Sequence, residues 1–237
     1  MVTSPTSGRA AGMWVPEGAA IPVRAPSFSA VTLARRKLAV IAVFTRETAE
    51  GSNIEAIVRQ TLSEASGLAL DAAMLSAAPF DAARPAGLLF GVAALPPTPG
   101  GGQAAVAADL GKLVADLVAR GGGLAPAFVA APAQATALKL MASPKFDAPV
   151  LASVVLPSGT VVAIEASSLV SGFDGTPEFS VSKAGTLHME SAAPQHIHAA
   201  SPVRELWQTD ALALKMTLAA AWAMRASYVA WVQNTTW

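Results

Sequence analysis

The sequence predicts an α+β fold with two structured regions separated by a loop. Three observations lead to this prediction: a long helical pattern at about residues 53–78, helical patterns mixed with β-branched runs at about 106–164, and large side chains on alternate residues at 211–218. Apolar residues spaced three and four apart are typical of a helix, and strict alternation is typical of a strand. A chain of 237 residues is long enough for one or two domains of this kind.

Composition argues against several classes of protein. Hydrophobic residues make up 53% of the chain and charged residues 14%, which excludes a disordered polypeptide. The 16 basic residues are balanced by 16 acidic ones, so binding of nucleic acid through bulk positive charge is disfavoured. The absence of cysteine excludes disulfides, thiolate zinc sites and thiol catalysis. The apolar stretch at 212–232 contains Lys215 and Arg225, and residues 1–20 lack the apolar run of a signal peptide, so no membrane segment is predicted.

An extended region and then the long helix occupy the first part of the chain. Residues 27–44 predict two strands, or one bent strand, broken at residues 35–37. Ser52 and Glu55 have the spacing of a capping box at the start of the helix, and Pro79 stops it. The Pro- and Gly-rich stretch at 79–102 predicts a loop at a domain boundary.

The rest of the chain predicts shorter elements of both kinds. In chain order they are a helix at 106–118, a strand at 127–130, a helix at 134–141, strands at 150–156, 160–164 and 181–189, an irregular connection at 191–201, and strands at 211–218 and 228–232.

Motifs for catalysis and cofactor binding are weak. His196 and His198 form an HxH pair, but they lie in an Ala-, Pro- and Ser-rich connection without a third ligand in register, which favours an exposed loop over a metal site. The glycine runs at 100–102 and 121–123 lack the Gly-Lys-Ser/Thr ending of a phosphate-binding loop. The sequence therefore predicts no catalytic residue, no cofactor, no metal ligand and no enzyme activity.

Charged side chains are better explained as surface groups or subunit contacts than as acid–base pairs. The candidate pairs are Glu205 with Asp210 and Asp71 with Glu64, and the single candidates for charged contacts are Glu55, Asp71, Asp210, Lys215 and Arg225. No residue is chosen among them as a binding site.

Tryptophans are concentrated at the C-terminus, where Trp207, Trp222, Trp231 and Trp237 follow one another, with only Trp14 elsewhere. Large aromatic side chains fill cores, and tryptophan is also enriched at subunit contacts. Both interpretations of the C-terminal tryptophans stay open at this point.

Several segments together resemble the major capsid proteins of tailed phages. They are Trp14–Ala19, Lys37–Val40, Thr45–Glu47, Leu70–Leu75, Arg84–Leu89 and, most specifically, Leu206–Met216 followed by Trp222–Arg225, Val229–Trp231 and Thr236–Trp237. The resemblance implies the Hong Kong 97 capsid fold. Under that fold, residues 1–30 are a residual arm and extended-loop segment, 31–84 and 181–237 form a peripheral domain with a spine helix and a sheet, and 85–180 form a mixed α/β axial domain.

The resemblance also implies a function. The expected protein is a structural major capsid protein of a phage or prophage whose copies pack as pentamers and hexamers into an icosahedral shell. That shell encloses double-stranded DNA without sequence-specific binding. Other capsid subunits are the main partners, with a scaffold, a portal and a maturation protease as further candidates. The expected location is the virion capsid, preceded by the host cytoplasm.

One departure from the family pattern concerns the N-terminus. In the family, an arm and the outgoing strand of the extended loop precede the Trp-Glu-Gly segment, whereas here only about a dozen residues do. The extended loop is therefore expected to be half a hairpin, and a lone strand is poorly stable in water. A truncated chain that folds but assembles weakly by itself is the resulting expectation, and regular closed shells formed by the purified chain alone would contradict it.

Two alternatives remain at this stage. An encapsulin-like nanocompartment shell shares the fold but holds cargo enzymes in place of a genome. A small α+β metal-dependent enzyme would use His196, His198 and Glu205, and it would retain bound metal after purification.

Overall fold

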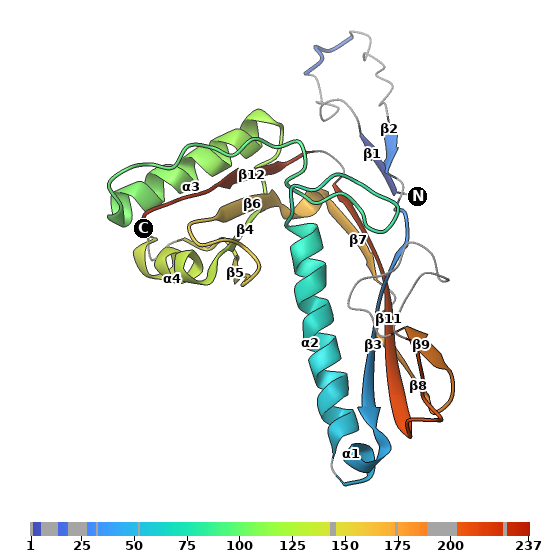
Figure 1. The fold of residues 1–237 in the computed structure, drawn as a ribbon. Helices are drawn as coiled ribbons and strands as arrows, with labels where there is room; N and C mark the ends of the chain where they lie inside the picture. The colour runs from blue at the N-terminus through green and yellow to red at the C-terminus, as the bar shows by residue number, and fades with distance from the viewer. Residues whose placement is uncertain are drawn as a thin grey trace. The chain divides into compact units, whose positions relative to one another are not determined.

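The computed structural model describes residues 2–5, 14–18, 28–31, 33–51, 53–142, 146–173, 175–188, 203–224 and 227–237. The chain forms two compact units, whose elements are labelled in Figure 1. Unit 1 comprises Met1–Arg35, Leu70–Gly172 and Ala221–Trp237, and unit 2 comprises Arg36–Ala69 and Phe173–Ala220.

Unit 2 combines a long helix with an antiparallel sheet. The central strand β11 (Ala211–Met224) pairs with β3 (Arg36–Thr45) on one edge and with β8 (Glu178–Ser182) on the other. After β3 come the short helix α1 (Arg46–Gly51) and the long helix α2 (Ile54–Met74), which runs beside β3 and β11 in Figure 1. Pairing from Thr45–Ala211 to Arg36–Ala220 fixes the register of the two long strands.

One face of this sheet packs against α2. Successive side chains of a strand point to opposite faces, so the apolar side chains on alternate residues all lie on that face. The cluster on that face consists of Leu62, Leu214 and Met216, with Val40, Ala42, Phe44, Val58 and Phe179 packed around them. Leu214 and Met216 are fully buried. The alternation at 211–218 therefore predicted both the strand and its inner face correctly.

The buried face of α2 is narrower than the sequence pattern indicates. Leu62 and Ser66 are buried, whereas Ile57 is 53% exposed and Ala65 is also exposed. Ser66 fits in the interior because its hydroxyl donates to the carbonyl of Leu62 at 2.7 Å, which satisfies the polar group within the helix.

The helix α2 ends earlier than predicted. The helix ends at Met74 and not at about residue 78, because the returning chain takes over its carbonyls: the Leu88 N–H donates to the Met74 oxygen at 2.7 Å. Ser52 lies outside the described residues. The Glu55 carboxylate accepts two hydrogen bonds from Arg59, one turn later, at 2.7 and 3.1 Å.

Unit 1 contains a four-stranded sheet covered by two helices on one face. The strand order is β12 (Val229–Val232), β6 (Val161–Glu165), β4 (Pro126–Ala130) and β5 (Val150–Ala152), antiparallel except for β4 and β5. The helices are α3 (Gly102–Ala119) and α4 (Pro132–Met141). A parallel pair needs a crossover connection, and α4 supplies it between β4 and β5.

Side chains that lie opposite one another on neighbouring strands form the core of unit 1. Phe128, Ala163 and Ala230 lie opposite one another on β4, β6 and β12, and each is at most 1% exposed. The side chains of α3 and α4 that meet this face include Leu113, Leu117 and Leu138, all fully buried. The predicted amphipathic helix at 106–118 is therefore present, and it begins four residues earlier.

Several short elements were not predicted, and some predicted boundaries were wrong. The structure adds the 3₁₀ helix Ala166–Ser168 and the strands β7 (Leu169–Phe173) and β10 (Val203–Glu205), and β10 pairs with β9 (Thr186–His188). The strand predicted at 181–189 is two strands separated by a turn, since β8 ends at Ser182 and Gly185 adopts a φ of 138°. The strand predicted at 150–156 ends at Ala152, whereas β11 continues to Met224, six residues beyond the predicted end.

The N-terminal strand is not alone. β1 (Val2–Pro5) pairs antiparallel with β2 (Phe28–Val31), from Val2–Val31 to Pro5–Phe28. The expectation of a lone, unpaired strand in the extended-loop segment is therefore wrong. Between these two strands, only residues 14–18 are described.

Gly159 holds the C-terminal segment of unit 1 in place. Its φ is +81°, and an added Cβ would lie 3.0 Å from the Thr235 nitrogen. We expect Gly159→Ala to lower the free energy of unfolding by about 1–2 kcal/mol, because an L side chain is strained in this backbone region. Gly111, inside α3 with open space around it, is the matched control: Gly111→Ala should raise stability by about 0.5–1 kcal/mol in the same urea titration.

Candidate assembly surfaces

Three of the C-terminal tryptophans pack into unit 1: Trp222 and Trp237 are buried, and Trp231 is half-buried. The indole N–H of Trp222 donates to the Ala86 carbonyl at 2.9 Å, and that of Trp231 donates to the Val92 carbonyl at 2.8 Å. The Trp237 indole N–H donates to a carboxylate oxygen of Asp109 at 2.9 Å. A buried tryptophan needs such a partner, so these three side chains fill and fix the fold.

Trp207 and Trp14 are different. Trp207 is 78% exposed, and Trp14 is fully exposed. No hydrogen bond of either indole N–H is found within the described parts of the chain. Neither side chain fills a core, so among the C-terminal tryptophans subunit contact stays a prediction for Trp207.

Backbone hydrogen bonds hold the turn that carries Trp207. Leu206 is buried, and its N–H donates to the Gly185 carbonyl at 2.9 Å. Ala211 closes the turn with a 2.9 Å bond to the Leu206 carbonyl, and Thr209 adds a hydroxyl bond to the Glu205 carbonyl at 2.9 Å. The turn is thus fixed in unit 2 while its aromatic ring faces solvent.

Asp210, at the end of this turn, adopts a φ of +45°, which is rare for a residue with a side chain. Its carbonyl accepts the Arg46 N–H at 3.0 Å, and its carboxylate lies 3.6 Å from the Arg46 guanidinium. Asp210 therefore forms an ion pair with Arg46, and it does not form an acid–base pair with Glu205.

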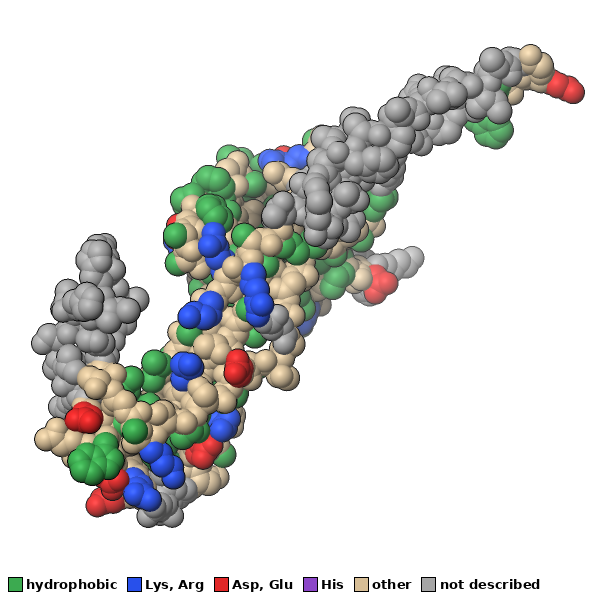
Figure 2. Space-filling model, turned by 90° about the vertical axis from the view of Figure 1, so that its right-hand side faces the viewer, with side chains coloured by type: hydrophobic (Ala, Val, Ile, Leu, Met, Phe, Trp, Pro, Cys, Tyr) green, Lys and Arg blue, Asp and Glu red, His purple; other side chains and the backbone are tan. Residues whose placement is uncertain are grey.

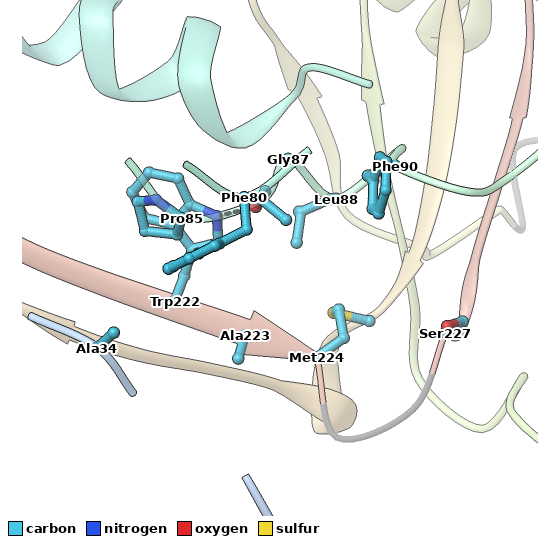
Figure 3. A pocket seen from close by; sticks show the side chains of 11 residues that line it. Ala34, Phe80, Pro85, Gly87, Leu88, Phe90, Trp222, Ala223, Met224 and Ser227 are labelled. Atoms are coloured by element: carbon cyan, nitrogen blue, oxygen red, sulfur yellow. Dashed lines mark hydrogen bonds between the residues drawn. The ribbon is translucent and has the colours of Figure 1, made fainter. Parts of the chain in front are cut away.

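An open pocket of about 300 Å³ lies in unit 1. In Figure 3, Phe80 and Trp222 stand at one end, Phe90 at the other, and Met224 below them. Phe80 and Phe90 are 58% and 51% exposed, so the mouth of the pocket is aromatic and accessible. The lining has no cluster of ionisable groups of the kind that catalysis needs.

Glu165, at the end of β6, is a buried carboxylate that the sequence analysis did not single out. It is 2% exposed and accepts the backbone N–H groups of Gly123, Leu124 and Ala125 at 2.6, 2.9 and 3.0 Å. The Ser167 hydroxyl donates to it at 2.8 Å. Burial by itself raises the pKa of Glu165, but these hydrogen bonds outweigh burial and hold the pKa below its ordinary value.

Asp109, on α3, is the second buried carboxylate of unit 1, at 1% exposure. It accepts hydrogen bonds from the Thr98 N–H and hydroxyl, from Trp237 and from the Lys112 ammonium. Burial raises the pKa of Asp109, and the bonds from Thr98, Trp237 and Lys112 lower it further than burial raises it. The carboxylate thus joins the loop before α3, the helix itself and the C-terminal residue.

These two carboxylates make the stability of unit 1 sensitive to acid. Because both pKa values are lowered on folding, the stabilisation is present above the unfolded-state values of about 4 and disappears as the pH falls through the folded-state values. We expect the melting temperature to fall steadily below about pH 5. In Glu165→Gln, the fall measured by circular dichroism should be shallower, and an equal slope in both proteins would contradict this assignment.

The other candidate contact residues are dispersed. The Asp71 carboxylate accepts the Ser153 hydroxyl at 3.2 Å, and Glu64 accepts the Gln60 amide at 2.8 Å, so the two carboxylates do not form a pair. Lys215 is exposed on β11. Arg225, His196 and His198 lie outside the described residues, and Glu205 is exposed at the end of β10.

Within the described residues, no three His, Asp or Glu side chains gather in a way that could hold a metal ion. The helices in the same residues include none that is both long and apolar enough to cross a membrane. On the face drawn in Figure 2, hydrophobic side chains lie in small groups between basic and acidic ones.

The comparisons with known proteins agree on one family. The sequence model of the phage capsid family matches residues 2–163. A protein described as a capsid polyprotein, from Pseudomonas phage PAJU2, is 32% identical over 251 residues, which cover 95% of this chain and 38% of that protein. The chain thus spans less than half the length of this relative.

Solved structures show the same fold. A chain from Mycobacterium phage Bobi superposes with a TM-score of 0.71 at 15% identity, covering 98% of this chain and 84% of that one. A chain from Microbacterium phage Oxtober96 gives 0.70 at 14% identity, covering 99% and 85%. The capsid of an empty GTA particle computed with C5 symmetry gives 0.65 at 14% identity, covering 99% and 84%.

The predicted α+β fold of the Hong Kong 97 type is therefore confirmed. The sequence match extends over more than half of the chain and includes the long helix α2 and the first strands of unit 1's sheet. This chain belongs to the phage capsid family.

Proposed function

We propose that this chain is a structural major capsid protein whose copies pack as pentamers and hexamers into an icosahedral shell around double-stranded DNA. The observation that carries the proposal is the family match over residues 2–163, together with a capsid fold that aligns with 98–99% of the chain. The relative from phage PAJU2 is itself described as a capsid polyprotein. Matches to phage and GTA capsids favour a viral shell over a nanocompartment or a metal-dependent enzyme.

The charge balance supports a shell that encloses DNA without binding particular sequences. With 16 basic and 16 acidic residues, the subunit has no excess positive charge with which to grip the phosphate backbone. Scaffold, portal and maturation protease are the further partners in this proposal, and the virion capsid, reached from the host cytoplasm, is the location.

The proposal assigns peripheral and axial domains to the chain. From the sequence, the peripheral domain comprises residues 31–84 and 181–237, with α2 as its spine, and the axial domain comprises residues 85–180. We move residues 229–237 to the axial domain, because β12 pairs with β6 and Trp237 belongs to the core of that sheet. The helix-covered sheet of unit 2 and the separate sheet and core of unit 1 support a division into two parts.

Negative-stain electron microscopy of the purified chain tests this function. Rings of five or six subunits, without regular closed shells, are the expected result at high protein concentration, since the purified chain is expected to assemble weakly by itself. Leu214→Asp is the matched control, because a charge in the buried face of unit 2 should remove the fold and the particles together. Dispersed single molecules under every condition would contradict the proposal.

A further inference from the structure

We draw no further inference here: the strongest candidate, the open aromatic pocket of unit 1 lined by Phe80, Phe90, Trp222 and Met224, carries none, because nothing in the structure shows what covers it.

Discussion

Replacing Trp237 with alanine is expected to lower the free energy of unfolding of unit 1 by about 3–5 kcal/mol. The side chain is only 9% exposed and belongs to the core formed by α3, α4 and the sheet. Its loss leaves a cavity in this core and removes the indole N–H that donates to Asp109. Urea denaturation followed by circular dichroism at neutral pH measures the change.

Trp207→Ala provides the matched control, because it removes the same side chain from an exposed position. On the isolated chain it should change stability by no more than about 0.5 kcal/mol. Equal losses of stability in the two variants would contradict the division of the tryptophans into core residues and exposed residues.

Glu165→Ala is expected to lower the free energy of unfolding by about 2–4 kcal/mol. The variant leaves the N–H groups of Gly123, Leu124 and Ala125 without their acceptor and loosens the connection between α3 and β4. Charge-assisted bonds are stronger than neutral ones, so most of this loss should also be present in Glu165→Gln. Hydrogen exchange of the three amides reports the change directly.

The control for Glu165 is Glu178→Ala. Glu178 is an exposed carboxylate on the strand β8, so its removal should change stability by no more than about 0.5 kcal/mol. Unchanged protection of the amides at 123–125 in Glu165→Ala would show that the carboxylate does not hold this segment.

Local sequence patterns predicted the elements that have strong periodicity. The helix α2 and the inner face of β11 follow from spacing alone, since apolar residues there repeat with the period of the structure. The ends of the helices and strands could not be predicted in the same way, because they depend on segments that are distant in the sequence. β11 continues through the alanines at 219–221 because β3 pairs with it as far as Ala220, although alanine favours helices.

The buried carboxylates show where prediction from sequence ends. Glu165 accepts hydrogen bonds from residues about 40 positions earlier in the chain, and Asp109 is joined to Trp237 across 128 positions. The N–H groups of Gly121 and Gly122 donate to the carbonyls of Val118 and Leu117 at the end of α3, whereas that of Gly123 donates to the Glu165 carboxylate. A local pattern cannot pair groups that only the tertiary fold brings together.

The same limit applies to the assembly surfaces. Sequence alone left the tryptophans divided between core and subunit contacts, because residue type does not determine burial. The hydrogen bonds of Trp222, Trp231 and Trp237 and the 78% exposure of Trp207 separate the two groups.

The central claim, that this chain is a self-assembling shell subunit, is tested most directly by the mass of the purified protein in solution. Size-exclusion chromatography with light scattering should give species of five or six times 24.0 kDa. The proportion of these species should rise with protein concentration. A single species of 24.0 kDa at all concentrations would contradict the account.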